Sequence, residues 1–206
     1  MGYEYVAITD HSGNLSIAKG MDEKTILKQM KEIDKLNDKF EDFIIFKGIE
    51  ANIDSFGFLD VPNKILDDMD IVLEGLHSGF NQNSKELTRR MLTAMENEYV
   101  NIIAHPTGRK ILDRKAYELD FEKVFDTSKD TNTILEVNSH LNLLDLNDGN
   151  IKMAVEHGCK LVINTDAHSP IHLKNIHLGI ATARRGWAEK KDIINTLPLK
   201  KLMKNF

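Results

Sequence analysis

The chain has 206 residues, of which 41% are hydrophobic, and this is enough apolar material for one domain with a substantial core. Its net charge of −5 excludes a globally basic surface, so any contact with nucleic acid has to come from local basic patches. The single cysteine, Cys159, excludes a disulfide framework and a thiolate zinc cluster, and the lack of a long apolar run or signal-peptide pattern excludes a membrane partner and predicts a cytoplasmic location.

Strand and helix patterns alternate along the chain. Apolar runs rich in β-branched residues predict six strands, at 5–9, 43–53, 71–77, 101–105, 133–139 and 160–166. Helical apolar spacing predicts helices at 21–40, about 84–97, 121–129 and 149–157, followed by a helical C-terminal third centred on 181–188. Repeated βα units of this kind imply parallel strands buried on both faces, in either a doubly wound sheet or a barrel.

Side chains that can bind metals follow five of the six predicted strands. They are His11, Glu50, His77, His105, Asp166 and His168. The remaining strand carries Glu136 and Asn138, interpreted as pocket lining, and His140. In a parallel barrel every strand opens on one face, whereas an open sheet gathers ligands near a single switch point. The distribution therefore favours a barrel. A lone strand-end histidine is more often structural, and the repetition across strands is what indicates metal ligands.

Several histidine and carboxylate ligands around one mouth suggest more than one metal ion. Such sites bind a phosphate between the metals and activate water for in-line attack, so phosphoester hydrolysis is the expected reaction. The residues expected to carry it are Glu50, His77, His105 and Asp166. The sequence has neither a GxxxxGK[ST] loop nor a GxSxG elbow. His157, His172 and His177 are interpreted as structural or solvated histidines.

Three arginines are candidates for phosphate binding near the mouth: Arg109, Arg184 and Arg185. The planar guanidinium suits phosphate oxygens. For Arg184 and Arg185 a solvated helix face is an equally good interpretation, and both stay open.

The motifs TDH (9–11), GIEA (48–51), LHS (76–78), AHPTG (104–108) and NTDAH (164–168) resemble, in order and spacing, the PHP domain, named for polymerase and histidinol phosphatase. HSGFNQ (77–82), HPTGR (105–109) and ARRGW (183–187) are similar to the C-terminal PHP domain of bacterial and archaeal family X DNA polymerases. The resemblance covers essentially the whole chain, as a single domain at 1–206. It implies a distorted TIM-like (β/α)7 barrel, a trinuclear zinc or manganese centre, and 3′–5′ exonuclease-type hydrolysis of single-stranded DNA 3′ ends.

Carried over residue by residue, the resemblance implies that Glu50 bridges two metals and that His77 and His105 complete the site sharing that bridge. Asp166 would ligate another metal, and His11 and His168 would hold the third. The family's first strand and helix, with their His-x-His motif, have no counterpart here, so fewer than three metals are expected. A barrel without this unit is expected to expose strand edges and core. The missing N-terminal segment, or a polymerase portion, is an expected partner.

Three functions remain open from the sequence. The first is the exonuclease-type phosphoesterase. The second keeps the chemistry but acts on a small phosphomonoester, as a histidinol phosphatase does. The third is an inactive remnant or binding module, suggested by the missing histidine pair.

Overall fold

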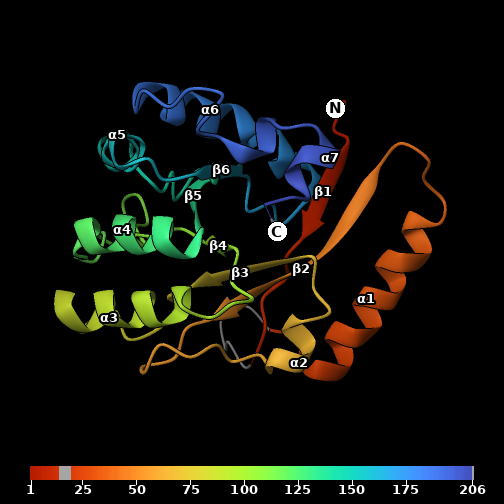
Figure 1. Cartoon of the computed structure of the whole chain (residues 1–206), viewed down its shortest axis with the longest axis horizontal. Helices are drawn as coiled ribbons and strands as arrows, with labels where there is room; N and C mark the ends of the chain where they lie inside the picture. The colour runs from red at the N-terminus through yellow and green to blue at the C-terminus, as the bar shows by residue number, and fades with distance from the viewer. Residues whose placement is uncertain (14–19, 206) are drawn as a thin grey trace.

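The computed structural model describes residues 1–13 and 20–205. Six parallel strands form one sheet in which each strand pairs with the next along the chain. The strands are β1 Tyr5–Ile8, β2 Ile44–Asn52, β3 Ile71–Gly75, β4 Ile102–Ile103, β5 Ile134–Asn138 and β6 Leu161–Asn164. The sheet curls into a half-barrel with helices between the strands (Figure 1), which confirms the predicted barrel architecture.

Helices connect the strands and cover the outside of the sheet (Figure 1). They are α1 Glu23–Asn37, α2 Asn63–Leu66, α3 Ser84–Met95, α4 Phe121–Thr131, α5 Asp148–His157, α6 Ile176–Arg185 and α7 Leu199–Leu202, with two 3₁₀ turns, η1 Pro170–Asn175 and η2 Ile194–Thr196. The predicted helical C-terminal third is present as η1, α6, η2 and α7. Its centre, 181–188, is helical only as far as Arg185, and Trp187 adopts a left-handed backbone with φ 63°.

Two hydrophobic clusters lie on opposite faces of the sheet. Alternation along each strand separates them, since successive strand residues point to opposite faces. The outer cluster contains Ile49, Val72 and Leu135 together with buried helix residues such as Met91 and Phe125. Among the described residues, the inner cluster contains none from the long helices. Its strand residues are Phe46, Ile71, Leu73, Ile102, Ile134 and Val162. The predicted metal ligands lie near the C-terminal ends of the strands.

The C-terminal segment covers the side of the sheet between β6 and β1. Ile193 bridges to Leu161 of β6, and the Asn195 side chain pairs with the backbone of Ile163 through bonds of 3.2 Å and 2.7 Å. On the other side, the Tyr5 hydroxyl of β1 donates to the Asn195 carbonyl at 3.2 Å. Figure 1 shows α7 beside β1. The expectation of an exposed strand edge is therefore wrong at β6, where the C-terminal segment pairs with the strand.

The other strand edge is more open, as expected. All four residues of β1 are half-buried or exposed, whereas every residue of β3 and β5 is buried. Because β1 pairs with β2 alone among the described strands, one of its edges has no strand partner there. This edge is where the unit expected from the resemblance would lie.

Asn195→Ala is expected to lower the free energy of unfolding by about 1–3 kcal/mol, because it leaves both the Ile163 N–H and C=O without their partner. Urea denaturation measures the change. Asn205→Ala is the control, since the Asn205 amide is exposed and bonds only to carbonyls within its own turn; it should change stability by less than about 0.5 kcal/mol. Equal effects of the two substitutions would contradict a bracing role for Asn195.

No helix among the described residues has the length and apolar character that a bilayer crossing requires. The cytoplasmic location stays a prediction.

Candidate metal centre

Glu50 is the centre of the predicted site. It lies on β2 and is buried, and its Oε1 contacts His105 Nε2 at 2.8 Å and His77 Nε2 at 3.1 Å. His11 bridges to Glu50 through its backbone, and its Nδ1 lies 3.7 Å from Glu50 Oε2. The structure thus gathers three imidazoles from the ends of β1, β3 and β4 around one carboxylate on β2, as the barrel interpretation requires.

Burial alone would raise the pKa of the Glu50 carboxyl. The hydrogen bonds from His105 and His77, together with the nearby imidazole charges, outweigh burial and hold that pKa well below its usual range. Burial likewise opposes charge on His105, but the bond and charge of Glu50 raise the pKa of His105 to about 10. Burial wins at His77, whose pKa is lowered. His105 therefore carries the proton that balances Glu50, and a cation bound there has to displace it.

The donor set fits a divalent transition metal. His11, Glu50 and His77 each offer one ligand atom, and these atoms all lie within 4.8 Å of one another. The Nδ1 atoms of His11 and His77 are buried and have no hydrogen-bond partner among the described residues. A buried imidazole nitrogen without a hydrogen-bond partner costs free energy. Coordination of a metal ion by that nitrogen would remove this cost. Imidazole with carboxylate is a usual ligand set for zinc.

Glu136 of β5 positions the His105 backbone next to the centre. Its Oε2 accepts the His105 backbone N–H at 2.7 Å and the Asn138 side-chain amide at 3.1 Å, and its Oε1 accepts from Asn164 at 2.9 Å. Burial, followed by the charges of neighbouring carboxylates, raises the pKa of Glu136 to about 7. The Asn138 amide also donates to Asp166 Oδ2 at 3.3 Å, so Glu136 and Asn138 of β5 connect His105 to Asp166. Their role as pocket lining stays a prediction.

Two of the strand-end residues have left-handed backbones. His105 has φ 31° and Asp166 has φ 47°, a region that residues other than glycine adopt uncommonly. Such strain costs on the order of 1–3 kcal/mol and clusters at functional sites, where the surrounding contacts hold it in place. For His105 that contact is the bond from its N–H to Glu136.

Gly75 leaves room for the two imidazoles. A Cβ at this position would lie 2.8 Å from His105 Cε1 and 3.0 Å from His77 Cε1. Gly75→Ala is expected to push the rings away from Glu50 and to weaken metal binding by about 10–100-fold, the range seen when ligand orientation is disturbed. Zinc titration calorimetry measures the change. Gly149→Ala is the control, because its nearest contact is at 3.3 Å on a helix; unchanged affinity in Gly75→Ala would contradict the packing argument.

His168 has different neighbours from His11. His11 packs edge-on against His77, with ring centroids 4.9 Å apart, whereas His168 lies in a cluster with His140 and His172. The pairing of His11 and His168 on one metal stays a prediction. The interpretation of His172 as a solvated residue is wrong, because its Nδ1 is buried.

The three arginines differ in their contacts. The guanidinium of Arg109 donates to the carbonyls of Leu143 and Leu144. Arg185 forms a salt bridge with Asp148 at 2.7 Å, and Arg184 is exposed. At least part of the Arg109 and Arg185 donor capacity is therefore used within the protein, and phosphate binding by any of the three stays a prediction.

Asp145 is a buried carboxyl near the centre that the sequence interpretation missed. Its Oδ2 accepts the Thr107 N–H at 2.9 Å, two residues after His105, and burial raises its pKa. Asp145 therefore fixes the loop that carries His105. The local sequence around Asp145 gives no sign that its side chain turns inward.

The fold and the gathered imidazoles define a class: a parallel βα half-barrel with a histidine and carboxylate centre at the C-terminal ends of its strands. No family model matches the chain. It is 45% identical over 199 residues to the Bacillus subtilis protein named DNA polymerase/3′-5′ exonuclease PolX, covering 97% of this chain and 35% of that protein. A probable phosphatase of Syntrophotalea carbinolica is 31% identical over 193 residues, covering 91% of this chain and 73% of that protein.

A solved structure has the same fold. The crystal structure of histidinol phosphate phosphatase from Lactococcus lactis, complexed with zinc, L-histidinol and phosphate, has a TM-score of 0.61 over 91% of this chain and 84% of that one, at 15% identity. The chain belongs to the PHP family. It spans about a third of the length of the Bacillus subtilis relative.

Proposed function

We propose that this chain is a metal-dependent phosphoesterase and that it acts on DNA 3′ ends in the manner of a 3′–5′ exonuclease. The observation that carries the proposal is the buried Glu50 carboxylate with His11, His77 and His105 around it. The name of the Bacillus subtilis relative, at 45% identity, supports the choice of DNA ends.

Divalent zinc or manganese held at this centre would polarise a phosphoryl oxygen and activate water for in-line attack. The residues themselves have separable tasks. Glu50 supplies the shared negative charge, and His11, His77 and His105 supply neutral nitrogen donors once His105 has released its proton. Glu136 orients His105 through the backbone, and Asp166, tied to Asn138, is the proposed ligand from the opposite strand. His168 is proposed as a metal ligand in the separate histidine cluster described below.

Phosphate recognition by Arg109, Arg184 and Arg185 is part of the proposal. Arg184 and Arg185 are both exposed, and Arg185 is engaged with Asp148, so Arg184 is the better placed of the two to meet a ligand from solvent. The partner is then a single-stranded DNA 3′ end bound mainly through its terminal phosphate, since the chain is acidic overall.

Incubation of the purified chain with manganese or zinc and a 3′-labelled single strand tests the proposal. Release of labelled mononucleotide that stops on addition of EDTA is the expected result. The same preparation is assayed in parallel on histidinol phosphate. If neither substrate is hydrolysed, phosphoesterase activity of this chain is refuted.

A phosphomonoesterase is the second candidate. The relatives named probable phosphatases and the neighbouring structure with histidinol and phosphate favour it. Faster turnover of histidinol phosphate than of the DNA 3′ end would select this function.

We also propose that residues 1–206 form a single domain that corresponds to the PHP portion of its longer relative, and that the first βα unit or a polymerase portion is its partner. The half-buried β1 edge supports this arrangement. A binding assay with the separately produced His-x-His unit tests it: no association would argue against this partner.

A further inference from the structure

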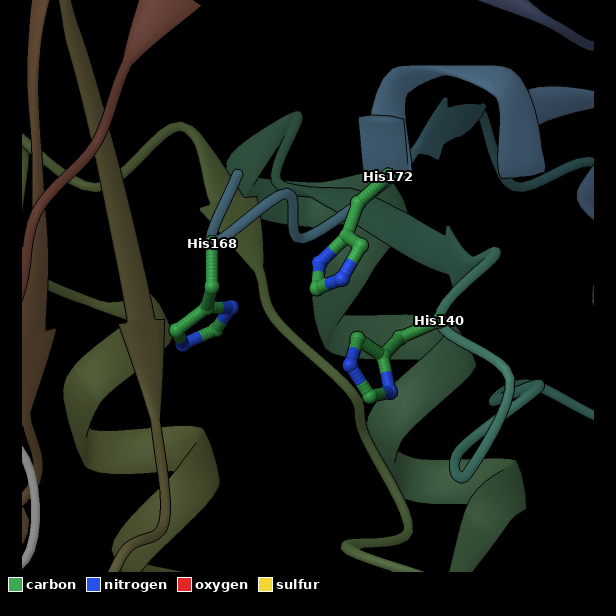
Figure 2. Close-up of side chains that lie close together, drawn as sticks. All are labelled: His140, His168 and His172. Atoms are coloured by element: carbon green, nitrogen blue, oxygen red, sulfur yellow. The ribbon is translucent and has the colours of Figure 1, made fainter. Parts of the chain in front are cut away.

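Three histidines form a second cluster beside the Glu50 centre. His140 follows β5, His168 follows β6, and His172 lies in η1. Figure 2 shows the three rings turned toward a common space. Each ring offers one nitrogen, and these nitrogens lie within 4.8 Å of one another. Three polar rings from separate segments converge here, although the motifs that define the family include only His168.

The His140 ring meets the other two rings edge to face. The centroid of His140 lies 5.8 Å from that of His172 and 6.1 Å from that of His168, with interplanar angles of 84° and 73°. His172 Nδ1 is buried and has no partner within the described residues. A buried nitrogen left unpaired carries a desolvation cost, which a bound cation would remove.

The surroundings hold two of the rings in place. His168 Nδ1 lies 2.9 Å from the Asp166 carbonyl and 3.5 Å from its carboxylate, and ligating histidines commonly have such partners. The backbone N–H of Asn142 donates to His140 Nδ1 at 3.3 Å, and the backbone N–H of His140 donates to Asn138 Oδ1 at 2.8 Å. Rings oriented by outside contacts lose less conformational freedom when an ion binds.

We propose that His140, His168 and His172 form a tri-histidine site for a divalent transition metal, with zinc as the preferred ion. Three imidazoles suit zinc and exclude magnesium and calcium, which take oxygen ligands. Tetrahedral zinc with nitrogen at 2.0–2.1 Å requires nitrogens about 3.3 Å apart, so small side-chain rotations complete the site. A fourth position would stay open to water or to a phosphate oxygen.

The tri-histidine site and the Glu50 centre can be tested separately, because different substitutions remove their ligands. Zinc content per chain is measured by mass spectrometry after dialysis for four proteins: the unaltered chain, His140→Asn/His172→Asn, Glu50→Gln and His177→Asn. His177 is the matched control, since it is exposed and lies five residues beyond His172. The double variant is expected to lose about one zinc per chain relative to His177→Asn, and Glu50→Gln is expected to retain that zinc.

A zinc content in the double variant equal to that of His177→Asn overturns the tri-histidine site. If Glu50→Gln loses no zinc while the double variant does, the Glu50 centre fails and this site stands. A second measurement does not depend on folding of the variants. Zinc added to saturation to the unaltered chain should shift the ring NMR signals of His140 and His172 and leave His177 unchanged. No shift at His140 and His172 also overturns the proposal.

Discussion

Glu50→Gln is expected to lower phosphoester hydrolysis by more than about 100-fold, beyond the effect typical of residues that only orient a ligand. The amide keeps the size of the carboxyl group but removes the negative charge that His11, His77 and His105 surround. Divalent ions at this centre would then face imidazoles without a charged oxygen ligand. The rate is measured on the substrate that the unaltered chain hydrolyses, alongside bound metal at equal protein concentration.

The same substitution has a readout that needs no metal. Glu50 is the main reason that the pKa of His105 is raised to about 10 despite burial. Without the carboxylate, burial opposes the charged imidazole more effectively, and the pKa of His105 is expected to fall well below 10. NMR titration of the imidazole in EDTA measures it. Glu118→Gln, at an exposed position, should change neither rate nor pKa. A His105 pKa that stays near 10 in Glu50→Gln would show that a group other than Glu50 raises it.

Glu74→Leu is expected to raise the free energy of unfolding by about 1–3 kcal/mol at pH 7, the usual cost of a buried polar group without partners. Glu74 lies on β3 between Val72 and Leu76, on the face that packs against the helices. It is fully buried, and neither carboxyl oxygen has a hydrogen-bond partner among the described residues. A leucine of similar size continues the apolar face, and urea denaturation measures the gain.

The gain depends on pH with a definite sign. Burial raises the pKa of Glu74 well above its ordinary 4.5, so the folded chain keeps a proton that the unfolded chain releases. The unaltered protein therefore loses stability as pH rises from about 4.5 toward the raised value, and Glu74→Leu does not. The difference between the two proteins should be small at pH 4.5 and larger at pH 7. Glu118→Leu, on the surface, should show no such trend; a pH-independent gain in Glu74→Leu would mean that Glu74 is not protonated on folding.

The local pattern of the sequence was sufficient to predict the strands, most helices and the barrel. Apolar runs and helical spacing depend on residues close together in the chain, so β2, β3 and α3 lie close to their predicted ranges. The convergence of Glu50, His77 and His105 was also predictable, because parallel strands place their C-terminal ends on one face. Chain order and spacing were enough to indicate membership of the PHP family.

What the tertiary structure alone decided concerns the direction of side chains and contacts between distant segments. It makes Glu50 the common partner of three imidazoles, places His172 with His140 and His168, and pairs Arg185 with Asp148. It also brings Asn195 to the edge of β6, 32 residues from its partner Ile163. The position of a residue at the end of a strand determines where its backbone lies. Which way a ring or guanidinium then turns depends on the packing and hydrogen bonds of residues far away in the chain, and these have no periodic signature in the sequence.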